Sequence, residues 1–280
     1  MVSKGAAEHS LREGNLVTAL KQLQEQVRAQ PADAKLRIFL FQMLAAMGQW
    51  ERGLDQLNVA AQLDPAALAM AQMYREALRC ELLRAEVFAG KRSPMVLGQP
   101  DQWLALLIES TRLAGSGQAA QAAELRASAF DAAPTSPGSL DGVAFDWIAD
   151  ADMRLGPVLE AILNGRYYWI PFSRIRRIDV EKPEDLRDLV WLPAHFEFTN
   201  AGEAVGVIPT RYPGSEMSED SAVCLARKTV WQEVSLGVFQ GLGQRLFATN
   251  LGEYPVMDVR SILLTASDAT ADAEGEAERG

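Results

Sequence analysis

Two carboxylates, Asp150 and Asp152, are the residues whose type and spacing most readily suggest chemistry. In an extended segment, side chains two positions apart point to the same side and can share one divalent cation, whereas on a helix they diverge. We favour ion pairing with Arg154 or Arg166 over a metal site, because apolar residues surround the two carboxylates in sequence. A metal-dependent or nucleotide-handling enzyme centred on Asp150 and Asp152 is the alternative from a different functional class.

The other residues with catalytic potential do not complete a recognisable motif. His9 and His195 are the only histidines in the chain, which is too few for a zinc cluster or a histidine-based catalytic pair. His195 and Glu197 have the spacing that opens a zinc-deaminase motif, but its Pro-Cys-x-x-Cys partner is absent. Gly241 and Gly243 lack the third glycine and the lysine of phosphate-binding loops, so a tight turn is the better interpretation. We therefore predict no catalytic residue, no metal and no cofactor.

Arginines and aromatic residues recur together in the second half and allow two interpretations. Buried arginine needs partners, and guanidinium groups readily pair with aspartate and stack on aromatic rings. The first interpretation is an internal network that fixes the C-terminal domain. The second is a partly exposed partner-binding surface, because Trp, Tyr and Arg are enriched among interface hot spots. Its candidate residues are Tyr167, Trp169, Arg187, Trp191, Arg211 and Tyr212, together with Arg52 and Arg75 from the first half.

The composition limits what the protein can bind. The 280 residues carry a formal net charge of −10, and their basic residues are spread thinly, so the chain would repel a nucleic-acid backbone. Cys80 and Cys224 are far apart in sequence and fit free thiols in a reducing compartment. No window approaches the roughly 20 apolar residues that a bilayer span requires, and the N-terminal region lacks the apolar core of a secretory signal. We expect a cytoplasmic protein without nucleic-acid or membrane partners.

A repeat runs through the first half of the sequence. Gly14 and Gly48 are 34 residues apart, as are Pro31 and Pro65, and this is the tetratricopeptide period. Each unit predicts a turn glycine between two helices and a proline that ends the second helix. Asp33 is a suitable N-cap for a helix whose residues 34–47 we expect in the core. Apolar residues at helical spacing mark the buried faces, with Leu16, Leu20, Leu23 and Val27 recurring as Trp50, Leu54, Leu57 and Ala61.

A third, weaker unit is expected around Gly117 and Pro134, whose separation matches that in the first two units. Arg126 then occupies a position where the apolar stripe requires a hydrophobic side chain. Between the units, residues 66–90 predict one long helix, followed by a turn-rich stretch at 91–100. Helical repeats of this kind form a concave surface that commonly receives a peptide or a helix.

In the second half, β-branched and aromatic runs alternate with turn residues. Strands are expected at residues 167–172, 175–180, 190–198, 204–208, 223–229 and 245–249. Short connections favour antiparallel pairing, and a short helix is expected after the linker at 133–142. The predicted fold class is α+β, with an N-terminal tetratricopeptide-like α-helical repeat domain at 1–134 and a smaller strand-rich α+β C-terminal domain at 135–265. The acidic tail at 266–280 is predicted to be disordered.

Several blocks of sequence, in a fixed order along the chain, carry a resemblance to a known family. The first half contains LRIFLFQ at 36–42 and GQWER at 48–52, and the second half contains FDWIADADMRLG at 145–156, NGRYYWIPF at 164–172, DLRDLVW at 185–191, IPTRYP at 208–213 and GLGQR at 241–245. These blocks resemble the ImpE family, also called TagJ or SciE-type. Together they cover most of the chain, and several independent blocks are more specific than any single short motif.

The resemblance implies an accessory protein of bacterial type VI secretion without enzymatic activity. It implies an adaptor that binds the N-terminal helix of the small contractile-sheath subunit, TssB, in support of sheath assembly and disassembly with the ATPase ClpV. Such a helix would lay its apolar face into a groove, and the negative charge of this chain favours a helix with basic flanks. A general scaffold that bridges secretion components through the helical repeat is a further alternative. The sequence leaves open the oligomeric state and the domain that holds the helix.

Overall fold

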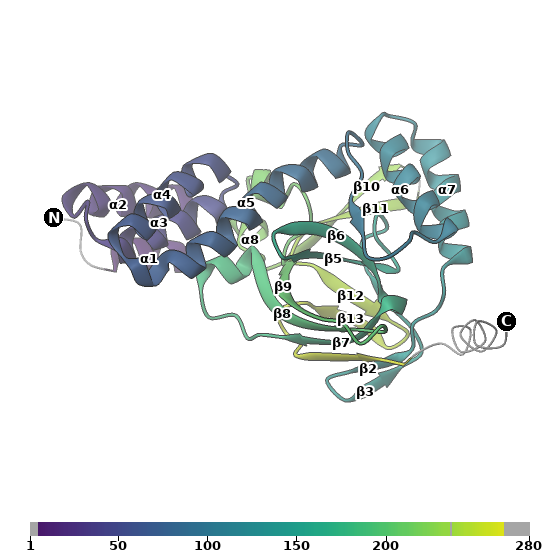
Figure 1. Cartoon of the computed structure of the whole chain (residues 1–280). Coiled ribbons are helices and arrows are strands. Elements are labelled where there is room, and N and C mark those ends of the chain that lie inside the picture. The colour runs from purple at the N-terminus through teal and green to yellow at the C-terminus, as the bar shows by residue number, and fades with distance from the viewer. Residues whose placement is uncertain (1–4, 236, 266–280) are drawn as a thin grey trace.

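Antiparallel helix pairs build the first half of the molecule in the computed structural model, which describes residues 5–235 and 237–265 (Figure 1). The pairs are α1 (Ala6–Arg12) with α2 (Leu16–Ala29), α3 (Ala34–Ala46) with α4 (Trp50–Leu63), and α6 (Gln102–Gly115) with α7 (Ala119–Ala132). The 3-10 turn η1 (Pro65–Ala67) leads into the long helix α5 (Leu68–Phe88), which lies between the last two pairs. The predicted α+β class, with helices first and strands second, is confirmed.

Glycine and aspartate define the ends of these helices. Gly14, Gly48 and Gly117 have φ values of +80°, +66° and +81°, each at the turn between the two helices of a pair. This left-handed conformation favours glycine, because a side chain there meets the backbone. Asp33 accepts hydrogen bonds of 2.9 and 3.2 Å from two backbone N–H groups in the first turn of α3, as expected of its N-cap. Local sequence chemistry therefore sets where the helices begin and end.

A nine-stranded sheet dominates the second half, in the order β1-β6-β5-β9-β8-β7-β14-β2-β3. Its strands are β1 (Met95–Val96), β2 (Gly138–Leu140), β3 (Val143–Phe145), β5 (Val158–Leu163), β6 (Arg166–Pro171), β7 (Ile175–Val180), β8 (Trp191–Phe198), β9 (Glu203–Pro209) and β14 (Ser261–Leu264). Neighbouring strands are antiparallel except for β1, which runs parallel to β6. Because β1 lies between α5 and α6 in the chain, it joins the helical segment to the edge of the sheet.

Two smaller sheets accompany the large one. Strands β4 (Ile148–Asp150), β12 (Leu246–Thr249) and β13 (Gly252–Pro255) form a three-stranded sheet in which β4 is an edge strand, and β10 (Thr229–Ser235) and β11 (Val238–Gly243) form a hairpin. The connections contain the helical turns η2 (Phe172–Arg174), η3 (Leu186–Leu189), η4 (Ser215–Met217) and α8 (Ser221–Cys224). Figure 1 shows the β10–β11 hairpin beside α6.

Each face of the large sheet contributes to a separate hydrophobic core. On one face, Val158 and Trp169 pack with residues of the helices. On the other face, Leu159 and Ile170 pack with Phe247 of β12. Successive residues of a strand point to opposite faces, so β5 is buried along its whole length. Alternate positions of β5 and β6 therefore face the helical layer.

Two local predictions are wrong. Instead of a short helix, strands β3, β4 and β5 follow the linker, because the apolar run at 158–163 is buried on both sheet faces. The run at 223–229 is also not a strand. Asp220 accepts a hydrogen bond of 2.8 Å from the Ala222 N–H and begins α8, so β10 starts only at Thr229. Local capping outweighs the β-branched composition here.

Cys80 and Cys224 are both buried and unpaired. Within the described part of the chain, no helix has the length and apolar character needed to cross a bilayer. The acidic segment at 266–280, predicted to be disordered, lies outside the described residues.

Candidate functional site

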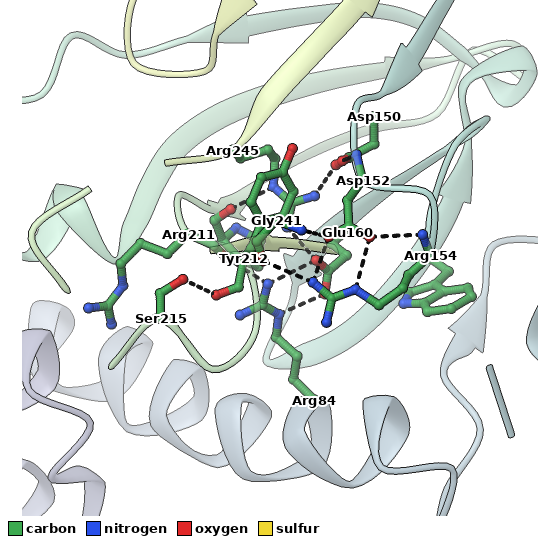
Figure 2. A network of polar contacts seen from close by, with 12 residues as sticks. Arg84, Asp150, Asp152, Arg154, Glu160, Arg211, Tyr212, Ser215, Gly241 and Arg245 are labelled. Carbon is green, nitrogen blue, oxygen red and sulfur yellow. Dashed lines mark hydrogen bonds and ion pairs between the residues drawn. The ribbon is translucent and has the colours of Figure 1, made fainter. Parts of the chain in front are cut away.

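A buried ion-pair network occupies the boundary between α5 and the large sheet (Figure 2). Glu160 of β5 is fully buried and accepts two hydrogen bonds from Arg84 of α5, at 2.7 Å from Nε and 2.9 Å from Nη2. Arg245 is also fully buried, and its two terminal nitrogens donate to Glu160 and to Asp150. Paired guanidinium forks thus satisfy one carboxylate and join the helical half to the sheet.

Tyr167 and Trp169 belong to this network because strand alternation places both on the helix-facing side of β6. The Tyr167 hydroxyl donates to Glu160, and Trp169 Nε1 donates to the Tyr167 hydroxyl oxygen at 2.6 Å. Both side chains have no exposed surface. Tyr167 and Trp169 therefore belong to an internal network, and not to a partly exposed partner-binding surface.

Burial and charge have opposite effects on the carboxylates of the network. Burial alone would raise the pKa of Glu160, but the guanidinium groups of Arg84 and Arg245 lower that pKa to about 2. Burial raises the pKa of Asp150 to about 6, because the opposing effect of Arg245 is smaller there. Glu160 is therefore the fixed negative charge of the network, held between two cations.

Asp150 and Asp152 have separate arginine partners. Asp150 pairs with Arg245, whereas Asp152 accepts hydrogen bonds from Arg154 Nε at 2.9 Å and Nη2 at 2.6 Å. Asp152 also accepts the Gly241 N–H at 2.7 Å. The favoured ion pair between Asp152 and Arg154 is thus present. Among residues 5–235 and 237–265, no group of three or more His, Cys, Asp or Glu side chains is arranged to hold a metal ion.

Trp191, at the start of β8, lies in an aromatic cluster supplied by the helices. Its ring centroid is 6.4 Å from that of Phe41 in α3, 6.0 Å from that of Trp50 in α4 and 5.6 Å from that of Tyr74 in α5. Its Nε1 donates to buried Glu81 at 2.9 Å, which satisfies the indole N–H. This fully buried tryptophan therefore anchors three helices to the sheet.

Two arginines of the second half cap helices of the first half. Arg211 Nη1 donates to the carbonyl of Ala46 at 2.6 Å, and Arg211 Nη2 donates to that of Ala45 at 3.4 Å, at the end of α3. Arg227 donates in the same way to two carbonyls at the end of α1, both at 3.0 Å. The last carbonyls of a helix lack intrahelical partners and carry the negative end of its dipole, so cations are favourable there. Arg211, which is 3% exposed, thereby positions the helices on the sheet.

Gly241 and Gly243 lie in strand β11 and not in the tight turn expected from the sequence, and Gly241 packs against Tyr212. This tyrosine is fully buried, and Arg245 Cζ lies 5.3 Å from its ring centroid. A Cβ added to Gly241 would fall 2.3 Å from the Tyr212 ring, so only glycine leaves room for it. Gly243 has a φ of +90°, which also favours glycine.

The remaining predicted partner-binding residues lie nearer to solvent and on separate elements. Arg52 is exposed on α4. Arg75 of α5 is half-buried and donates from Nε to Asn58 at 2.7 Å. Arg187 of η3 lies over the Tyr74 ring, with its Cζ 5.1 Å from the ring centroid. These three arginines reach the surface, whereas the other predicted partner-binding residues are buried, namely Tyr167, Trp169, Trp191, Arg211 and Tyr212.

An apolar groove that the sequence analysis did not identify lies between the end of α7 and the edge strand β4. It encloses about 350 Å³ and its lining includes Phe130, Pro134, Trp147, Met153 and Pro157. Trp147 is 37% exposed, which is unusual for so large an apolar side chain. Trp147 and Met153 lie on either side of the Asp150 and Asp152 carboxylates in sequence. The tryptophan and methionine that bracket them were the better indication of a binding surface.

The fold and site together define a class of protein, in which a helical layer is fixed to one face of a large sheet by satisfied arginines. An X-ray crystal structure of a protein from Vibrio parahaemolyticus has this fold, with a TM-score of 0.86 and 26% identity over 94% of this chain and 99% of that one. The profile of the family described as ImpE protein matches residues 142–263. A Pseudomonas aeruginosa protein described as type VI secretion system accessory component TagJ is 52% identical over 265 residues, which are 94% of this chain and 92% of that protein. The chain therefore belongs to the ImpE/TagJ family, as its sequence blocks indicated.

Proposed function

We propose that this protein is a non-enzymatic accessory adaptor of a bacterial type VI secretion system and binds the N-terminal helix of the small sheath subunit TssB. It would act in the cytoplasm, in support of sheath assembly and disassembly with the ATPase ClpV. The 52% identity to the accessory component TagJ supports the secretion role. Arginine pairing of Asp150, Asp152 and Glu160 supports binding over catalysis, because these carboxylates are committed to internal contacts.

The main structural support for this proposal is the apolar groove between α7 and β4. An amphipathic helix binds by inserting apolar side chains from one face, at positions i, i+3 or i+4, and i+7. Trp147 supplies a large, partly exposed anchor of the type found at binding hot spots. Met153 contributes a flexible side chain to the lining of the groove, and Phe130 contributes a rigid one. The groove therefore has the chemistry that the apolar face of a helix requires.

Acidic residues beside the groove favour a helix with basic flanks. Asp131 and Asp146 are exposed and adjoin Phe130 and Trp147 in sequence. They add to a chain whose formal net charge is −10. Charge complementarity acts mainly on the rate of association, and salt screens it. The association rate should therefore fall as salt is raised, while an unchanged rate would remove electrostatic steering from the proposal.

The direct test titrates a fluorescent synthetic peptide, corresponding to the TssB N-terminal helix, with the full chain and records anisotropy. We expect saturable binding in the submicromolar to micromolar range. Trp147→Ala should weaken it about tenfold or more, because the variant removes the central anchor. Val205→Ala is the matched control, since Val205 is an apolar residue of β9 that is 69% exposed but lies outside the groove. The control should bind like the wild type.

Two outcomes would contradict this assignment at different levels. An anisotropy that stays flat up to saturating peptide would discard the TssB helix as the partner. Binding that survives Trp147→Ala but is weakened by charge reversal at Arg52, Arg75 or Arg187 would keep the partner and move its site to those arginines. Circular dichroism of each variant establishes that the compared proteins share one fold.

A further inference from the structure

A second cavity lies between the α6–α7 pair and the β10–β11 hairpin, and it shares no lining residue with the apolar groove. Its volume is about 190 Å³, against the ~30 Å³ that one water occupies in the liquid. Alanine and valine side chains form part of its lining, and the polar and aromatic residues there are Arg126, Arg154, Ser110, Thr111, Ser235, Gln240 and Phe88. It is therefore large enough for a small polar group, and two arginines face it.

Arg126 of α7 is the feature that distinguishes this cavity. Only 7% of the residue is exposed, and it is the arginine that interrupts the apolar stripe of the third repeat unit. No acceptor among the described residues forms a hydrogen bond or an ion pair with its guanidinium. Burial lowers the pKa of Arg126, and the more distant charge of Asp152 opposes that change only in part. A buried cation without a partner is costly, so a counter-ion would be favourable.

Asp152 is the acidic side chain whose charge acts on Arg126, but its oxygens are already occupied. Arg154 donates to both of them, and the Gly241 N–H donates to Oδ2 at 2.7 Å (Figure 2). Arg154 is therefore neutralised by Asp152, and Arg126 remains as one uncompensated positive charge at the cavity wall. The hydroxyls of Ser110 and Thr111 donate to backbone carbonyls of their own helix pair, at 2.6 and 3.1 Å, and add no charge.

One positive charge on a planar donor matches one carboxylate better than it matches a doubly charged phosphate. A guanidinium presents two parallel N–H groups at the spacing of carboxylate oxygens, which gives charge-assisted, bidentate hydrogen bonds. The amide of Gln240 can donate to the same anion. We propose that this cavity binds a single carboxylate group, with Arg126 as its principal ligand. The inference does not depend on TssB or on the apolar groove.

Thermal unfolding of the full chain tests the proposal. The probes are sodium acetate, for a free small carboxylate, and N-acetyl-glutamate amide, for an acidic side chain of a polypeptide. Sodium chloride at equal ionic strength is the reference, and inorganic phosphate is the competing anion. A ligand that binds only the folded state should raise Tm, here by about 2–4 °C near saturation. A shift with acetate, with N-acetyl-glutamate amide or with both supports the site and separates the two sources.

Arg126→Met is the decisive variant, because it removes the guanidinium but retains similar apolar volume. It should fold, since it deletes an unpaired buried charge, and it should lose the carboxylate-dependent shift. Arg28→Met, at an exposed arginine of α2, changes the net charge equally and should keep the full shift. Arg126→Lys retains the charge without the fork and should show a smaller shift. If Arg126→Met does not fold, Arg126→Lys alone tests the proposal.

Any of four results would overturn the proposal. The wild type could respond to neither carboxylate beyond the chloride reference. Phosphate could produce a larger shift than acetate, which would assign the cavity to a different anion. Finally, Arg126→Met and the wild type could shift equally, or Arg126→Lys could show the full wild-type shift, which would place the binding elsewhere or remove the need for a guanidinium.

Discussion

Arg84, Arg245 and Arg126 are buried to a similar degree, with 4%, 0% and 7% of each residue exposed, but their surroundings differ. Arg84 and Arg245 both donate to Glu160, so the fold supplies their counter-charge. Arg126 lines a cavity and, among the described residues, has no hydrogen-bonded anion. Burial alone therefore does not give an arginine a structural role. The role depends on whether the fold provides a carboxylate within reach.

Trp191 and Trp147 show the same contrast for apolar contacts. Trp191 is fully buried among aromatic rings of three helices. Trp147 keeps 37% of its surface exposed at the edge of the groove. Trp191 has its contacts within the chain, whereas the contacts of Trp147 are incomplete. Incomplete contacts are where a partner can contribute binding energy.

The largest loss of stability is expected when Glu160 of the internal network is replaced. Glu160→Gln would leave Arg84 and Arg245 facing a neutral side chain in the interior, and should lower the free energy of unfolding by about 3–5 kcal/mol. Urea denaturation monitored by tryptophan fluorescence measures the loss. Glu109→Gln is the matched control, because Glu109 pairs with Arg112 on the exposed face of α6. A loss no larger than that of the control would show that the network does not hold the two halves together.

Glu160 should also determine part of the loss of stability that the protein undergoes in acid. Its pKa in the folded protein, about 2, is below the value of about 4.3 expected for glutamate in the unfolded chain. The unfolded state therefore takes up the proton first as pH falls. The stabilisation is complete above about pH 4.3 and disappears as pH falls toward the folded value. Between about pH 2 and about pH 4.3, the free energy of unfolding of the wild type should fall more steeply with decreasing pH than that of Glu160→Gln. Equal slopes would refute the role assigned to Glu160.

An intermediate effect is expected at the helix caps. Arg211→Met removes buried donors from the end of α3 and should reduce the free energy of unfolding by about 1–3 kcal/mol, since buried carbonyls lose their partners. Arg227→Met removes the corresponding contact at α1, where the arginine is exposed and water can replace it. The loss should therefore be smaller. Equal losses in chemical denaturation would contradict the importance of burial in this pair.

The smallest effect, and one of opposite sign, is expected at the unpaired arginine. Without added carboxylate, Arg126→Met should leave the free energy of unfolding unchanged or raise it by about 1 kcal/mol, because an uncompensated buried charge is removed. The measurement is urea denaturation in chloride buffer, beside Glu160→Gln. A large loss of stability in Arg126→Met would show that this arginine has structural partners after all, and would erase the contrast with Arg84 and Arg245.

Local chemistry made much of the helical half predictable. Turn glycines such as Gly48 and the N-cap Asp33 act within a few residues of themselves, so their effect can be inferred without the fold. Strands at 175–180 and 204–208 followed from composition in the same way. The run at 158–163 was harder, because an apolar segment buried on both sides has no periodicity that separates strand from helix.

By itself, the sequence determined the ends of the helices in the first two repeat units, the α+β class and the family, because each depends on residues close together in the chain or on blocks in a fixed order. Only the tertiary structure decided which arginines are satisfied. Glu160 is 76 residues from Arg84 and 85 residues from Arg245 in sequence. Contacts over such separations exist only when the helices pack on the sheet, so spacing alone cannot distinguish Arg245, which has a carboxylate, from Arg126, which lacks one.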